Sequence, residues 1–102
     1  MSKTSSNIYA KALKAWGEEA QLDMVIEEMA ELIQAISKFR RARTQEKKAK
    51  AYIHMCEEIA DVENMINQLR YMFDADLIDK FKAEKLQRTM KRIRKDRDES
   101  NS

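Results

Sequence analysis

The sequence predicts an all-α protein in which two long helices form an antiparallel hairpin within a four-helix-bundle-type domain. The 102 residues include one Gly and no Pro, so few positions interrupt a helix. Residue types with high helix propensity are frequent along the whole chain. No segment sustains the alternation of apolar and polar residues that is typical of a strand.

The first two helices are expected on either side of the single glycine. A short helix is predicted over about 7–16, with Ser5 or Ser6 as its N-cap. Gly17 is expected to end it, because glycine adopts the left-handed backbone of a helix C-terminus at little cost. A second, long helix is predicted over about 18–43.

Polar residues delimit the other two helices. Thr44 is suited to cap a third helix over about 45–73. The Asp74-Ala75-Asp76 break supplies a cap for a fourth helix, which is expected to end at about Lys95. A short polar link between the two central helices favours their antiparallel pairing.

The chain length favours one domain with a modest core. We expect a flexible N-terminus (1–6), a single helical domain (7–95) and a polar, disordered tail (96–102). More apolar residues remain than two long helices can cover, so we expect a homodimer or homotetramer to complete the bundle. These residues are Ile8, Leu13, Tyr52, Cys56, Ala60, Leu77, Ile78, Phe81, Leu86 and Ile93.

The composition excludes several classes of protein. One glycine rules out the Walker and dinucleotide-binding loops, and one Cys with one His rules out the common zinc motifs and an intrachain disulfide. No apolar run approaches the roughly 20 residues that span a bilayer, and we expect no signal peptide, because the first residues have no basic-then-apolar pattern. We therefore expect a cytoplasmic protein with no membrane partner.

Charge is segregated along the chain. Residues 18–31 contain six acids and residues 54–63 contain four, in both cases without Lys or Arg. Residues 38–50 have a net charge of +6, and residues 80–97 have a net charge of +7. Acidic and basic blocks therefore alternate.

Two carboxylates fall inside the apolar stripes of the central helices. At about 100° per residue, Glu58 lies between Met65 and Leu69, with Asp61 about 60° away at the edge of the stripe. The second helix repeats this pattern. Glu28 lies between Ala35 and Phe39, and Glu31 follows at the edge.

A hairpin would bring these four carboxylates together. Ionised carboxylates in an apolar setting are costly unless they are paired or bind a cation, and no Lys or Arg lies nearby on either stripe. Oxygen-only ligands favour Mg²⁺ or Mn²⁺, which also bind substrate phosphates. Any one of these acids alone is more often a solvated surface residue. The repeated spacing on two helices favours a metal site.

Two segments resemble a known family. Glu27-Glu28-Met29-Ala30-Glu31 and Glu58-Ile59-Ala60-Asp61 resemble the EExxE and ExxD motifs of the MazG-like, all-α nucleoside triphosphate pyrophosphohydrolases. The flanking residues are also similar, in Trp16-Gly17, Gln21-Leu22 and Lys85-Leu86-Gln87-Arg88. The resemblance covers about residues 7–93.

The resemblance implies Mg²⁺-dependent cleavage of a nucleoside triphosphate, ribose or deoxyribose, between its α- and β-phosphates, with Mn²⁺ as a possible replacement. The implied metal ligands are Glu28, Glu31, Glu58 and Asp61. Glu27 matches the first glutamate of EExxE and is a candidate catalytic residue that orients or deprotonates water.

Four further residues are candidates for substrate binding. Lys85 and Arg88 match the basic C-terminal segment of the family and are candidates for holding outer phosphates, although they also fit a solvated basic face. Trp16 is a candidate for stacking on a base, or else a packing residue. Asn64, one turn after Asp61, is a candidate for a hydrogen bond to phosphate or sugar.

Two other functions compete with this one. A di-iron carboxylate bundle would need Glu-x-x-His on two helices, whereas His54 lies outside both motifs. A non-catalytic module that binds nucleic acid or protein is suggested by the basic C-terminal helix and by the seven methionines. The acidic blocks and the lack of a nucleic-acid-binding motif argue against nucleic acid as the partner.

Overall fold

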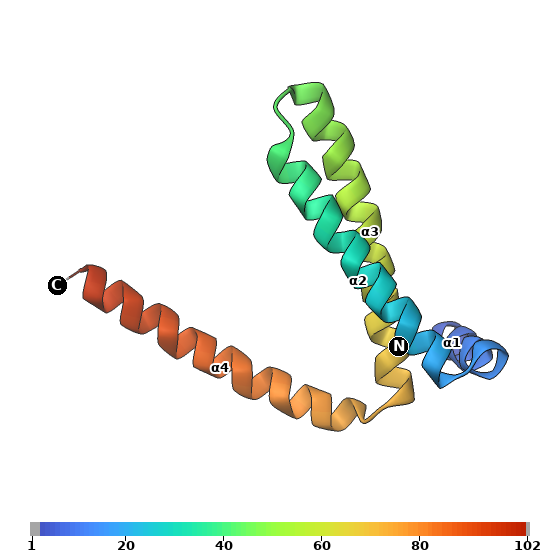
Figure 1. The fold of residues 1–102 in the computed structure, drawn as a ribbon. Coiled ribbons are helices and arrows are strands. Elements are labelled where there is room, and N and C mark those ends of the chain that lie inside the picture. Colours follow the sequence, from blue (N-terminus) through green and yellow to red (C-terminus); the bar gives the residue numbers. More distant parts are fainter. Residues whose placement is uncertain (1–2, 102) are drawn as a thin grey trace.

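The computed structural model describes residues 3–101, with side chains described from Asn7 onward, and consists of helices joined by short connections (Figure 1). The described part of the chain contains no strand, which confirms the all-α fold class. The helices are α1 (Lys3–Trp16), α2 (Glu18–Arg41), α3 (Gln45–Met72) and α4 (Ala75–Ser100).

The connections follow the predicted capping residues. Gly17 has φ 86°, a left-handed backbone that favours glycine, and its N–H donates to the carbonyl oxygen of Leu13 at 2.8 Å. The Thr44 side chain accepts a hydrogen bond from the N–H of Lys47 at 3.2 Å. Asp74 accepts one from the N–H of Leu77 at 3.0 Å. These caps fix the starts of α3 and α4.

Three helix ends differ from the prediction. α1 already begins at Lys3, which places Ser5 and Ser6 within the helix, and α2 ends at Arg41. α4 continues to Ser100, so the expected helix end near Lys95 was wrong. No Gly or Pro interrupts this segment, and the hydroxyl of Ser100 donates to the carbonyl oxygen of Asp96 at 2.9 Å. Residues 1–2 and 102 lie outside the described residues.

The central hairpin is formed by α2 and α3, which run antiparallel and pack along their length, as predicted (Figure 1). α1 lies across the open end of this hairpin and contacts both helices. The buried amide of Gln68 on α3 donates to the carbonyl oxygen of Tyr9 at 3.1 Å. This bond ties α1 to the hairpin.

α4 extends away from the hairpin and contacts α3 only around the bend that joins them (Figure 1). Arg70 and Asp79 form an ion pair across this bend, with Nη2 2.9 Å from Oδ1. The radius of gyration is 18.1 Å, compared with about 13 Å for a compact chain of about 100 residues. The helices of a single chain therefore do not close into a bundle.

The apolar core is small. Among the described side chains, the buried apolar residues are Tyr9, Val25 and Ala35. Large apolar side chains of the two central helices are exposed instead, including Ile33, which is 66% exposed. Apolar faces on all four helices thus have no partner within the described chain. No described helix has the length and apolar character needed to cross a membrane.

Candidate functional site

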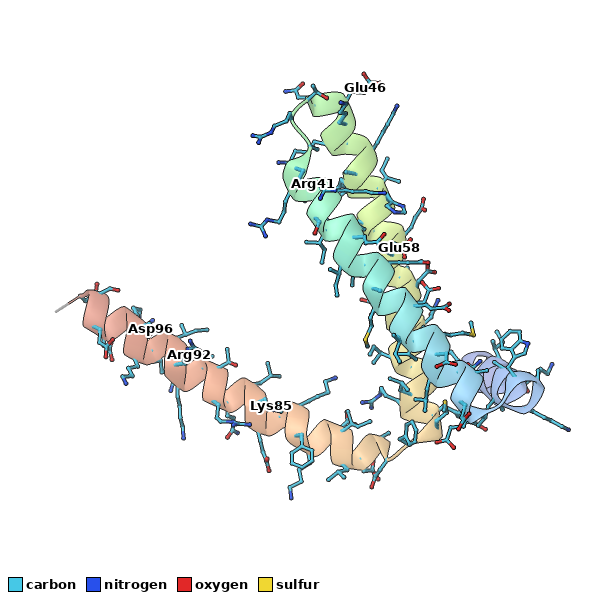
Figure 2. All side chains as sticks on the ribbon, viewed as in Figure 1. Arg41, Glu46, Glu58, Lys85, Arg92 and Asp96 are labelled. Carbon is cyan, nitrogen blue, oxygen red and sulfur yellow. The ribbon has the colours of Figure 1, made fainter. Side chains whose placement is uncertain are left out.

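Three carboxylates meet in the middle of the hairpin. Glu28 and Glu31 come from α2 and Glu58 comes from α3, and one carboxylate oxygen of each lies within 4.8 Å of the other two. Figure 2 labels Glu58 at this level of the hairpin. The i, i+3 spacing on α2 places two acids on consecutive turns that face α3. The predicted convergence of these three residues is therefore observed.

Burial leaves two of the carboxylate oxygens without partners. Glu58 is only 8% exposed and Glu28 is half-buried, whereas Glu31 is exposed. The Oε2 atoms of Glu28 and Glu58 are both buried and accept no hydrogen bond. A buried acceptor without a partner loses its hydration with no compensation. These two atoms are therefore suited to receive a ligand.

The environment raises the pKa of both buried carboxyl groups above the ordinary value. For Glu58, burial is the main cause, followed by the charges of Glu31 and Asp61. For Glu28, burial again acts first, followed by the charges of Glu31, Asp61 and Glu58. Burial first, and the repulsion between the acids second, thus favour protonation of these groups or a nearby cation.

The donor set fits a hard divalent cation. All three side chains offer oxygen, and carboxylate oxygens are the ligands that Mg²⁺ and Mn²⁺ prefer. Among the described residues, neither Lys nor Arg forms an ion pair with any of the three. The nearest basic group is His54, whose Nε2 lies 3.8 Å from Oε1 of Glu58. Oε2 of Glu58 therefore stays available.

The other two acids of the motifs lie at the margin. Asp61 is exposed and does not belong to the cluster of three, but its charge raises the pKa of both Glu28 and Glu58. Glu27 is also exposed and makes the smallest contribution to the raised pKa of Glu28. Asp61 thus flanks the site on α3, and Glu27 lies outside the tight cluster.

A cavity of about 310 Å³ lies between α1, α2 and α3. Trp16 and Asn64, the two candidates for binding the nucleoside part of a substrate, both line it, and Trp16 is 61% exposed. The other lining residues are Ile8, Tyr9, Ala12, Gln21, Met24, Met65 and Gln68. The structure therefore brings Trp16 and Asn64 together, from helices far apart in the sequence.

Two buried glutamines in this wall were missed by the sequence reasoning. Gln21 is fully buried, and its Oε1 has no hydrogen-bond partner, while its Nε2 approaches the sulfur of Met24 at 3.5 Å. Around the helix axis, Gln21 lies about 20° from Glu28. The helical period that places Glu28 inside the apolar stripe therefore also places Gln21 there. Gln68 lies about 80° from Glu58, and the pattern of α3 gives no signal for its burial.

Lys85 and Arg88 lie elsewhere. Together with Thr89 and Arg92 they line a shallow cleft on α4, which extends away from the hairpin (Figure 2). Both side chains are exposed. A single chain therefore does not bring them to the carboxylates.

Comparison of the chain with protein-family models, with curated proteins and with solved structures finds no match.

Proposed function

We propose that the protein is a Mg²⁺-dependent nucleoside triphosphate pyrophosphohydrolase, with Mn²⁺ able to replace Mg²⁺. The observation that carries this proposal is a pair of buried carboxylate oxygens that have no hydrogen-bond partner. One belongs to Glu28 in the first acidic motif, and the other belongs to Glu58 in the second. Two facing carboxylates without a Lys or Arg partner are suited to a cation that also binds phosphate.

The proposed reaction consumes one water molecule. The anhydride bond between the α- and β-phosphates breaks, and the products are a nucleoside monophosphate and pyrophosphate. Glu28, Glu31, Glu58 and Asp61 would hold the cation, which supplies charge neutralisation on the phosphates and a lower pKa for bound water. Glu27 is proposed to orient or deprotonate the attacking water.

The cavity beside the carboxylates supports a nucleoside-binding role. Met24 precedes Glu28 by four residues and Asn64 follows Asp61 by three, so the cavity begins about one helical turn from the acids. The indole of Trp16 offers a flat surface for a base, and Asn64 offers an amide for the sugar or a phosphate. A cavity with an apolar wall and few polar groups is typical of small-molecule sites.

A homodimer or homotetramer is part of this proposal. The exposed apolar side chains on all four helices support it, because single soluble chains rarely leave so many without a partner. Association would also be the route by which Lys85 and Arg88 approach the carboxylates, since these bases belong to an arm that leaves its own hairpin.

The test is a panel of canonical and modified ribo- and deoxyribonucleoside triphosphates incubated with Mg²⁺, with products separated by chromatography. Monophosphate together with pyrophosphate is expected, and the activity should disappear in EDTA and in Glu58→Gln. Diphosphate with inorganic phosphate would contradict the proposed bond cleavage.

The alternative is a non-catalytic binding module, and the same material tests it. A salt-dependent shift of DNA or RNA without divalent cation, combined with the absence of any cleaved nucleotide, would favour the module.

A further inference from the structure

A basic cleft lies at the closed end of the hairpin, where α2 passes into α3. Its volume is about 370 Å³, and its lining includes Lys38, Arg41, Lys47, Lys50 and His54. Figure 2 labels Arg41 at this end of the hairpin. The basic block at residues 38–50, to which the sequence assigned no role, thus folds so that bases from both helices line one cleft.

The charges in this cleft are largely uncompensated. Lys50 pairs with Glu46, with Nζ 3.5 Å from Oε1, but both side chains are well exposed to solvent. Among the described residues, Lys38, Arg41 and Lys47 have no carboxylate within ion-pair distance. Like charges gathered in one cleft repel one another, and a multiply charged anion would relieve this repulsion.

The cleft and the carboxylates lie on the same side of the hairpin. Around the axis of α2, the position of Lys38 is rotated by about −80° from that of Glu28. Glu31 is rotated by about −60° from Glu28, so Lys38 and Glu31 lie on nearly the same side of the helix. On α3, His54 is rotated about −40° from Glu58, close to the −60° of Asp61. His54 joins the two features, because it lines the cleft and its Nε2 is 3.8 Å from Oε1 of Glu58.

Three features therefore follow one another along this side of the hairpin, in the same order on both helices. On α2 the order is Met24 in the cavity, Glu28 in the acidic cluster and Lys38 in the cleft. On α3, which runs antiparallel, the order from the same end is Asn64, Glu58 and Lys50. A nucleoside triphosphate has a matching order, with its base, its inner phosphate and its outer phosphates in a line.

We propose that the basic cleft at the hairpin tip binds the outer phosphates of a nucleoside triphosphate, and the pyrophosphate that leaves. This inference rests on the proposed function for the identity of the substrate, but the binding of a polyphosphate anion to the cleft is separable from catalysis. Arg41 offers two-point hydrogen bonds to phosphate oxygens, and Lys38 and Lys47 contribute compact charges. The cleft supplies these bases from the same chain as the carboxylates, unlike Lys85 and Arg88.

The test measures the binding of inorganic pyrophosphate by calorimetry, in Mg²⁺ and at physiological salt. Arg41→Ala and Lys38→Ala should each weaken binding by roughly ten- to a hundredfold, the value of one charge-assisted contact to phosphate. Arg40→Ala is the matched control, because it removes an exposed arginine from the adjacent position of α2, which does not line the cleft. It should leave binding within about fivefold, which is the upper effect of one exposed, screened charge. Arg41→Lys should recover part of the loss.

The outcomes separate this inference from the proposed function. If nucleotides are cleaved while Arg41→Ala and Lys38→Ala bind pyrophosphate like the parent, the cleft is not the phosphate site and the hydrolase stands. If the two variants bind pyrophosphate more weakly but the parent protein cleaves no nucleotide, the phosphate site is supported and the proposed hydrolase activity is contradicted. If Arg41→Ala and Lys38→Ala bind a DNA oligonucleotide more weakly than the parent does, but bind pyrophosphate equally well, the cleft binds a nucleic-acid backbone. That result would overturn the inference.

Discussion

The Nε2 atom of His54 lies 3.8 Å from Oε1 of Glu58, one helical turn away on α3. This contact occupies one oxygen of the most buried carboxylate in the site, while Oε2 of the same group has no partner. The charge of His54 acts against the other influences on Glu58, yet burial and the neighbouring acids still raise the pKa of Glu58. The imidazole thus lies beside Oε1 and leaves Oε2 of Glu58 free for a cation.

Glu58→Gln should lower the activity by more than about a hundredfold. Replacing a residue that only supports a metal ligand already lowers metal affinity or activity by about 10- to 100-fold, and Glu58 is proposed as a ligand itself. Glu28→Gln should behave similarly, because both residues have a buried oxygen without a partner. Steady-state cleavage of the best substrate is the measurement. Glu57→Gln is the control, since Glu57 is the exposed acid beside Glu58. Full activity in Glu58→Gln would remove the metal-site assignment.

Stability without metal should decrease as pH rises. The folded state raises the pKa of Glu28 and Glu58, so it binds protons more tightly than the unfolded chain does. The associated stability is complete below the ordinary pKa of 4.5 and is lost as pH rises through the raised values. In EDTA at pH 7, the urea midpoint of unfolding of Glu58→Gln should therefore equal or exceed that of the parent. The difference between the two midpoints should become smaller below pH 4.5.

Added Mg²⁺ should reverse this order near neutral pH, because the ionised carboxylates bind it only in the folded state. The thermal midpoint of the parent should rise with Mg²⁺ concentration, and that of Glu58→Gln should rise much less. Equal shifts in both proteins would show that the cation binds elsewhere.

Trp16→Ala should raise KM with a smaller effect on kcat. Stacking of a base on an aromatic side chain contributes roughly 1–3 kcal/mol, or about fivefold to more than a hundredfold in binding. Trp16→Phe should retain most of the affinity, because it keeps an aromatic face. Trp16 is largely exposed, so its loss should leave the helical circular dichroism unchanged. If Trp16→Ala instead has the parent KM, Trp16 belongs outside the substrate site.

Lys85→Ala and Arg88→Ala should weaken substrate binding by roughly ten- to a hundredfold if an associated copy presents these bases to the phosphates. Arg97→Ala, further along the same helix, is the control. Mixing Arg88→Ala with Glu58→Gln should then restore activity, because one mixed site would have both intact residues. Parent-like kinetics in all three single variants would assign Lys85 and Arg88 to the solvated surface.

The face of the hairpin opposite the acidic cluster should mediate association. On α2, Ile26, Met29, Ile33 and Ile36 are exposed at alternating spacings of three and four residues. On α3 and at its C-cap Phe73, exposed apolar residues recur every seven positions, at Tyr52, Ile59, Ile66 and Phe73. Around their helix axes, these residues of α2 and α3 are rotated by about +60° to +160° from Glu28 and Glu58, respectively. Glu31 and Asp61 are rotated in the opposite direction, so the apolar residues lie on the other side of the hairpin. Such heptad spacing is typical of helices that pack against other helices.

Ile33→Lys and Ile59→Lys should therefore reduce the mass of the oligomer to that of a monomer in sedimentation experiments. Ile53→Lys is the matched control, because Ile53 is on α3 and 59% exposed, more than the 38% of Ile59, but lies off the heptad line. It should leave the oligomer intact. A compact parent monomer at micromolar concentration would contradict the predicted association.

The sequence by itself determined the helices and the pairing of the acidic motifs. Gly17, Thr44 and Asp74 act locally, through a left-handed backbone or a cap to a nearby N–H, so their roles could be predicted without any tertiary contact. Glu28 and Glu58 could be placed on inner faces because the helical period alone relates them to Ala35 and Leu69. The convergence of Glu28, Glu31 and Glu58 then required only that the hairpin be antiparallel.

Only the tertiary structure decided the direction of α4, the true extent of the core and the neighbours of each polar group. The apolar residues of α4 predict that it is covered, but not by which surface, and in one chain it leaves the hairpin at the Arg70–Asp79 bend. The burial of Gln68 depends on the carbonyl of Tyr9, 59 residues earlier, and no local period encodes that contact. The basic cleft likewise exists because α2 and α3 meet at their tip, which brings Lys38 and Arg41 beside Lys47 and Lys50.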